Sequence, residues 1–281
     1  MTVKLAHFRE LEDALAEEPF DESRWIVLED WLLQGEDPRA QLVILEKQGA
    51  DTGPALRELA PVLLGDEHRT LDEKLYQRDW RAGFLRECQY TGGPDPLRSF
   101  LEAPASSLLR SFTVTADPSD VDRTVDAFVQ RRCVRSLRRL TLSSWNHDGS
   151  DRRIACAGLH EMVQLRHLIL RTVMVQAAPV LPKLHALTLA PMRTSVVALT
   201  DQLGQIPWPS ITDLGYEAPD MHDAGVGLRS LLALVDETTF PALQRLEIVG
   251  LAPAEHELVA PRLADVCAHR GVALTMLIGT S

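Results

Sequence analysis

Cysteine is scarce and unpatterned in this 281-residue chain. The four cysteines are Cys88, Cys133, Cys156 and Cys267. Because none of them forms a C-x-x-C pair, their spacing indicates neither a disulfide framework nor a zinc site. We expect reduced, mostly buried thiols, which are typical of a cytoplasmic protein.

Long apolar runs are also missing. No stretch approaches the roughly 18 apolar residues that a membrane-spanning helix needs. The first ten residues lack the apolar core of a signal peptide, and acidic residues follow at once. The sequence therefore predicts a cytoplasmic protein that has no membrane partner.

Catalytic signatures are absent as well. The chain contains no G-x-x-x-x-G-K-[ST], no G-x-G-x-x-G after a strand and no G-x-S-x-G. The pair His160-Glu161 does not complete the zinc motif H-E-x-x-H, because Gln164 stands in place of the second histidine. We therefore expect a protein without enzymatic activity, without a cofactor and without a metal site.

Negative charge is concentrated near the N-terminus. Residues 1–80 contain nine Lys or Arg and nineteen Asp or Glu, so they hold −10 of the total net charge of −11. Phosphate binding needs a basic surface, and this distribution argues against nucleic acid as a partner. Solvated acidic helix faces explain the charge, and a basic protein docking on this section is the alternative.

A six-residue phrase, apolar-x-x-apolar-x-apolar, recurs through the rest of the chain. Its six copies and a degraded seventh begin at Leu109, Leu137, Leu165, Leu184, Ile211, Leu243 and Gly271. The steps between them are 28, 28, 19, 27, 32 and 28 residues, mostly at or near the period of leucine-rich repeats. The last three positions alternate as in a half-buried strand, and helix-like segments lie between most phrases. The sequence predicts an α/β fold, a right-handed solenoid with parallel strands.

The repeats depart from the common pattern in two respects. The slot that usually holds Asn or Cys holds Asp117, Trp145, Val173, Met192, Pro219 and Leu251. We expect looser turns, since no ladder of Asn side chains forms hydrogen bonds with the backbone groups there. The 19-residue step predicts a plain loop around Val175–Pro182 in place of a helix.

The section before the repeats has helical periodicity. We expect five helices, the last of which reaches about Trp80, and then a strand from Phe84 to Tyr90. The predicted organisation is an all-α cap over residues 1–80 and a solenoid over residues 81–281. A terminal repeat needs its apolar end covered, and the helical section is placed to do this.

The segment from Arg24 to Arg39 resembles the repeat-companion domain at the N-terminus of many bacterial leucine-rich repeat proteins. The residues that match its A-D-W-L and G-D-P-R core and its leading arginine are Arg24, Asp30, Trp31, Leu32, Gly35, Asp37, Pro38 and Arg39. The departures are Glu29, Ala40, Gln41 and the extra residue Glu36. The resemblance implies a cap followed by repeats and implies no activity. From the residues themselves, we expect Asp30 to pair with Arg39.

Solenoids bind partners with the face of their stacked strands, so the outward strand positions are the candidate site. The predicted partner-binding residues are Arg139, Thr141, Ser143, His167, Arg171, Asp213, Glu217, Arg245 and Glu247. Basic side chains occupy the earlier strands, whereas the last two carry acidic or mixed charge. This gradient favours a protein or peptide bound in one direction, although any exposed strand face carries residues of this kind.

Two other functions stay open from the sequence. The segment Trp145–Asp148 gathers polar side chains in an expected strand-to-helix loop, which is the place for a small enzymatic or enzyme-accessory site. A polar turn containing Gly149 explains the same residues. The third possibility is a structural scaffold subunit of a larger assembly.

Overall fold

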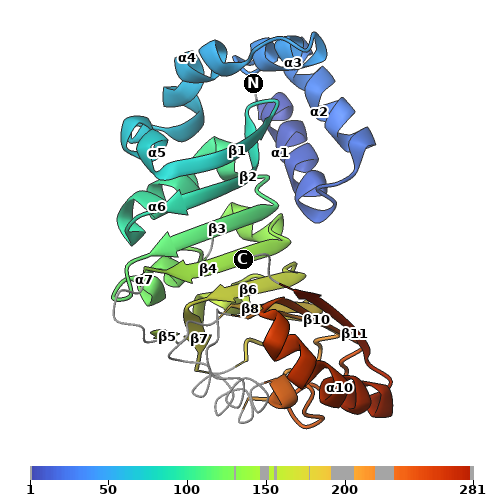
Figure 1. Cartoon of the computed structure of the whole chain (residues 1–281). Helices are drawn as coiled ribbons and strands as arrows, with labels where there is room; N and C mark the ends of the chain where they lie inside the picture. Colours follow the sequence, from blue (N-terminus) through green and yellow to red (C-terminus); the bar gives the residue numbers. More distant parts are fainter. Residues whose placement is uncertain are drawn as a thin grey trace.

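The chain is an α/β protein with N-terminal helices and a nine-stranded, mostly parallel sheet (Figure 1). This computed structural model describes residues 2–129, 131–145, 152–154, 157–176, 178–190, 206–218 and 231–278. Over those residues, no helix has the length and apolar character needed to cross a membrane.

Five helices precede the sheet. They are α1 (Thr2–Glu17), α2 (Glu22–Gln34), α3 (Ala40–Lys47), α4 (Gly53–Leu64) and α5 (His68–Lys74). Helix α2 begins where the Asp21 carboxylate accepts hydrogen bonds from the backbone of Ser23 and Arg24, and it ends before Gly35. Trp25, which lies on the inner face of α2, is 1% exposed, and it belongs to an apolar cluster that joins α1, α2 and α3 to Ala82, Phe84 and Leu108.

The main sheet follows chain order. Its strands are β1 (Leu75–Arg81), β2 (Phe84–Thr91), β3 (Ser111–Ala116), β4 (Arg139–Ser144), β6 (His167–Arg171), β8 (Ala186–Ala190), β9 (Asp213–Glu217), β10 (Arg245–Leu251) and β11 (Ala273–Ile278). The β1–β2 pair is antiparallel, and every later pair is parallel. Short strands β5 (Arg152–Ile154) and β7 (Val173–Val175) form a separate parallel pair.

The repeated phrase accounts for the register of this sheet. Its fourth positions form one row across the strands, and the row consists of Phe112, Leu140, Leu168, Leu187, Leu214, Leu246 and Leu274. The first six of these side chains are at most 2% exposed. Burial of each contributes roughly 1.5–3 kcal/mol, which favours this register over any other. The prediction of parallel strands at the phrases is confirmed.

Helical segments connect most strands. They are α6 (Pro94–Glu102), η1 (Pro104–Ser106), α7 (Val121–Asp126), η2 (Arg132–Arg135), η3 (Ala157–Glu161) and α10 (Pro253–Arg270), where η denotes a 3-10 helix. Figure 1 shows the N-terminal helices at the β1 end of the sheet and α10 toward the opposite end. Residues 176 and 178–185 contain no helix, as the 19-residue step predicts.

The fifth predicted helix is shorter than expected. We expected it to reach about Trp80, but α5 ends at Lys74 and β1 begins at Leu75. Leu75 pairs with Tyr90, and Trp80 pairs with Leu85, so strand β2 provides hydrogen-bond partners that local helical periodicity does not reveal. Tertiary pairing overrides the local pattern here.

The predicted pairing of Asp30 with Arg39 is wrong. Arg39 instead donates two hydrogen bonds to Asp37, each 2.8 Å long, while Asp30 lies 3.6 Å from the amine of Lys47. The Arg39 guanidinium stacks on the ring of Phe8 at 4.9 Å and on that of Phe84 at 4.7 Å. Arg39 thus links α1 to the start of the sheet through cation–π contacts.

Polar contacts attach helix α1 to the repeats. Asp13 forms a 2.6 Å ion pair with Arg135, and Arg138 donates hydrogen bonds to the carbonyls of Ala16 at 2.8 Å and Glu17 at 2.5 Å. Arg138 is only 4% exposed, and burial followed by repulsion from Arg166 lowers its pKa to about 10. A buried cation therefore occupies the negative C-terminal end of α1.

Candidate functional site on the strand face

The outward positions of the sheet form three rows, one for each outward position of a strand. The first row contains Ser111, Arg139, His167, Ala186, Asp213 and Arg245; the second contains Thr113, Thr141, Ile169, Thr188, Gly215 and Glu247; and the third includes Thr115, Ser143, Arg171 and Ala190. Glu217 of β9 is in register with Val249 of β10. Most of these side chains are half-buried or exposed, so the face is available to a partner.

One groove of about 420 Å³ lies over strands β2, β3, β4 and β6. Hydroxyl and amide groups dominate its lining, and they belong to Gln77, Gln89, Ser111, Thr113, Thr115, Thr141 and Ser143. Arg139 and Arg171 add positive charge, and Glu87 lies at the β2 side. Hydroxyl and amide groups both donate and accept hydrogen bonds, so this surface is suited to backbone amides as well as polar side chains.

A second groove of about 390 Å³ lies over strands β6, β8, β9, β10 and β11. Its polar lining consists of His167, Thr188, Asp213, Arg245, Glu247 and Thr275. Gly215 is on the same surface, and a Cβ atom there would lie 2.8 Å from the Thr188 hydroxyl oxygen. The missing side chain at this position keeps the groove open between neighbouring strands.

Most charges on this face are already paired with one another. Arg171 donates a 2.8 Å hydrogen bond to Glu217, past strand β8, where Ala190 is in register with Arg171. Arg245 pairs with Asp213 on the adjacent strand. In contrast, the side chains of Arg139 and Glu247 form no ion pair or hydrogen bond with any described residue. These two charges are free for a partner.

His167 makes the stability of this face depend on pH. Its ring lies 2.9 Å from the Thr188 hydroxyl, and burial, followed by repulsion from Arg139 and His185, lowers its pKa to about 4 although Asp213 opposes the shift. Since the unfolded chain takes up this proton near pH 6.5, stability is complete above that pH and falls as the pH drops toward 4.

We expect His167→Gln to reduce this loss of stability by about 1–2 kcal/mol, a range that allows for partial exposure of the ring. Urea unfolding of both proteins at pH 7 and pH 4.5 measures the difference. Equal pH dependence in the two proteins would show that His167 does not contribute.

The predicted site residues converge on the two grooves. The first contains Arg139, Thr141, Ser143 and Arg171, and the second contains His167, Asp213, Arg245 and Glu247. Glu217 lines neither groove. Thr141 lies in the outward row, as predicted, but its side chain is only 7% exposed.

Sequence reasoning missed the residues that β1 and β2 add to the first groove. Glu87 and Gln89 are in register with Ser111 and Thr113, so alternation along β2 was the signal that could have identified them. Gln77 had no such signal, because its segment was predicted to be helical.

The alternative site is only partly described. Trp145 is 50% exposed at the end of β4, and residues 146–148 lie outside the described residues.

Cys88, Cys133 and Cys267 are free thiols and are buried, and burial raises the pKa of the Cys133 thiol to about 12. Among described residues, no group of three or more His, Cys, Asp or Glu side chains is arranged to hold a metal ion.

The comparisons with known proteins are negative. No protein-family model matches the chain, and neither the curated proteins nor the solved structures yield a match.

Proposed function

We propose that this chain is a leucine-rich repeat solenoid with a repeat-companion cap, and that it binds a protein or peptide through its strand face without catalysing a reaction. The order of the strands supports the proposal, because successive phrases form adjacent parallel strands with their apolar positions in register. Residues 2–74 form five helices at the first edge of that sheet, where a cap is required.

The two free charges are the observation that carries the binding proposal. Arg139 lines the first groove and Glu247 lines the second, whereas Arg171 and Arg245 have partners within the chain. A partner that places an acidic group at Arg139 and a basic group at Glu247 gains two ion pairs without breaking an existing one. This complementarity favours a single orientation of the bound segment.

The spacing of these charges indicates the length of the bound segment. Arg139 lies on β4 and Glu247 on β10, and four inter-strand steps of about 4.8 Å place the two strands roughly 19 Å apart. An extended chain covers that distance with about six residues. We therefore expect a linear segment that has an acidic and a basic residue about six positions apart.

A phage-displayed library of random linear peptides tests this proposal. Selection on the whole protein is expected to enrich peptides with that charge spacing, and their affinity is then measured by calorimetry. In the double variant Arg139→Glu and Glu247→Lys, the affinity is expected to fall at least about tenfold, since both new ion pairs become repulsive.

The matched control is Arg262→Glu with Glu257→Lys, which reverses the same two charges on the exposed side of α10. This control is expected to bind like the wild type. Peptides that bind the strand-face variant and the wild type equally well would exclude the proposed surface. The acidic helical cap would then be the next surface to examine.

A further inference from the structure

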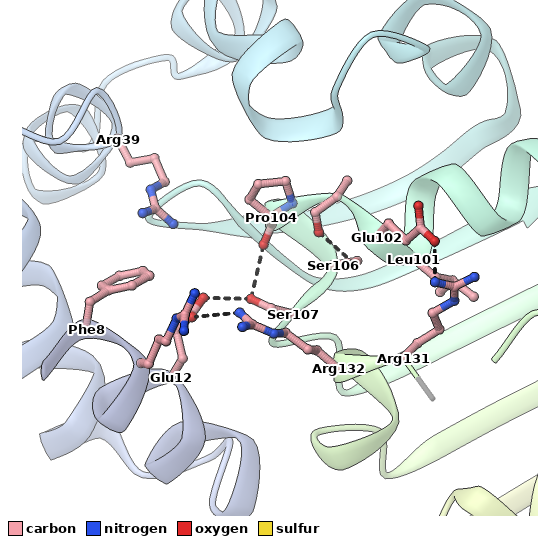
Figure 2. Close-up of a pocket in the computed structure, with 12 residues that line it drawn as sticks. Phe8, Glu12, Arg39, Leu101, Glu102, Pro104, Ser106, Ser107, Arg131 and Arg132 are labelled. Atoms are coloured by element: carbon pink, nitrogen blue, oxygen red, sulfur yellow. Dashed lines mark hydrogen bonds and ion pairs between the residues drawn. The ribbon is translucent and has the colours of Figure 1, made fainter. Parts of the chain in front are cut away.

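A separate cavity lies between α1 and the segment that contains α6, η1 and η2. It measures about 470 Å³, and Figure 2 shows side chains from α1 and from this segment facing one another across it. A smaller cavity of about 140 Å³ adjoins it, and the two share Arg9, Glu12, Ser107 and Arg132. The combined volume is within the usual range for small-molecule sites, about 300–1,000 Å³.

The lining of this cavity is positively charged, although the chain as a whole is acidic. Four arginines and two glutamates line it, namely Arg9, Arg39, Arg131, Arg132, Glu12 and Glu102. Asp37, which pairs with Arg39 from outside the lining, balances a third arginine, so an excess of one positive charge remains. The excess stands out because the surrounding residues 1–80 have a net charge of −10.

Two of these arginines are occupied by partners within the chain. Arg39 is hydrogen-bonded to Asp37, and Arg131 is paired with Glu102. These two guanidinium groups therefore shape the wall of the cavity and contribute part of its positive potential, but they are not the first donors that a ligand meets.

The other two arginines remain available. Arg9 is exposed and, within the described part of the chain, forms no ion pair or hydrogen bond. The side chain of Arg132 is 65% exposed, and its ion pair with Glu12 is long, at 3.7 Å, and is not a hydrogen bond, so its N–H donors can still reach a ligand. Guanidinium groups present paired N–H donors that match the oxygens of phosphate and carboxylate.

Glu12 is the acidic group at the junction of the two cavities. Its carboxylate accepts a 3.0 Å hydrogen bond from the Ser107 hydroxyl, and burial raises its pKa despite the nearby arginines (Figure 2). Protonation of Glu12 would remove the charge at the junction that opposes an incoming anion.

An apolar surface completes the cavity. Phe8, Leu101, Ala103 and Pro104 line it. A bare inorganic anion would leave this surface in contact with water, whereas an attached apolar group would cover it. Burial of that group adds roughly 25 cal/mol for each Å² removed from water.

We propose that this cavity binds a small phosphate monoester whose apolar or aromatic group packs against Phe8 and Pro104. A phosphate monoester carries close to two negative charges and three acceptor oxygens, and these oxygens match the paired N–H donors of the Arg9 and Arg132 guanidinium groups. A carboxylate has only two acceptor oxygens, which a single guanidinium group already satisfies, so it would leave the second arginine without a ligand oxygen.

Titration of the whole protein with phenyl phosphate, inorganic phosphate and benzoate tests the proposal by calorimetry. Phenyl phosphate is expected to saturate one site with a Kd of about 1 mM or below, given its size. Inorganic phosphate and benzoate are each expected to bind at least about tenfold more weakly, because each lacks one part of the recognised chemistry. No saturable binding of phenyl phosphate, or equal binding of either other compound, would overturn the assignment.

Variants locate the site. Arg9→Gln with Arg132→Gln is expected to weaken phenyl phosphate binding at least about tenfold, since both free guanidinium groups are lost. Arg262→Gln, which removes an exposed arginine from α10, is expected to leave binding unchanged. Circular dichroism checks that all variants fold. If the double variant does not fold, the single variants Arg9→Gln and Arg132→Gln are titrated with phenyl phosphate in its place. Unchanged binding in the folded Arg9 and Arg132 variants would disprove the site.

Discussion

Replacing Arg138 with alanine is expected to lower the free energy of unfolding by about 2–4 kcal/mol. The side chain is 4% exposed and donates hydrogen bonds to the carbonyls of Ala16, Glu17, Arg135 and Leu137. The substitution leaves four carbonyl groups without this donor and removes the positive charge at the C-terminal end of α1. Urea unfolding followed by tryptophan fluorescence measures the loss.

The attachment of the cap is expected to weaken more than the repeats themselves. Amide hydrogen exchange within α1 and α2 should accelerate before exchange in strands β4 and β6, because the lost contacts join the cap to the sheet. Faster exchange in α1 and α2 alone indicates that the contact between α1 and the rest of the protein is weakened. Equally faster exchange in β4 and β6 would indicate a general loss of packing.

The chain contains a matched control at the next repeat. Arg166 occupies the same position of its phrase as Arg138, but it is exposed and its side chain forms no hydrogen bond with a described residue. Arg166→Ala is expected to change stability by no more than about 0.5 kcal/mol. If both alanine variants lost the same amount, the contact with α1 would not be the cause.

Replacing Gly158 with alanine is expected to destabilise the protein by about 3 kcal/mol. A Cβ atom at this position would lie 2.4 Å from the carbonyl oxygen of Val125 and 2.9 Å from its carbonyl carbon. Because these are backbone atoms, relief requires η3 to move away from α7, which opens the buried contact between neighbouring repeats. Thermal and urea unfolding both measure the effect.

The sign of the change in stability distinguishes a steric clash at the added Cβ atom from the usual entropic effect of Gly→Ala on the unfolded chain. At an unstrained site, Gly→Ala stabilises by about 0.4–1 kcal/mol through the unfolded state. Gly93→Ala is the control, since the nearest atom to its added Cβ lies 3.9 Å away and its φ of −80° is ordinary. We expect it to change stability by less than about 1 kcal/mol. A neutral Gly158→Ala would show that the repeats adjust without cost.

The sequence predicted most of the sheet because the same apolar pattern recurs in successive phrases. Each phrase places three apolar residues at the same spacing, and a shift by one residue would turn those residues toward solvent. Helical periodicity also predicted the five helices that precede the sheet. The same reasoning failed at residues 75–80, where pairing with β2 determines the conformation and leaves no local trace.

The sequence predicted which residues lie on the candidate site, but it did not predict which of their charges are paired within the chain. Alternation along the strands identified Arg139, Arg171 and Glu247 as outward residues. It did not reveal that Arg171 pairs with Glu217, which lies 46 residues away in the sequence, because that contact depends on the spacing of β6 and β9 in space. Only the folded chain separates the paired charges from the free ones.

The cavity beside α1 had no sequence signal. Its walls come from residues 8–39 and from residues 101–132, which are brought together when the N-terminal helices pack against the segment that contains α6, η1 and η2. The sequence by itself determined the strands at the repeated phrases, their order and their outward faces, since each follows from local periodicity repeated along the chain. Tertiary structure decided which charges remain free and where a cavity opens, because both depend on distances between segments that the sequence keeps far apart.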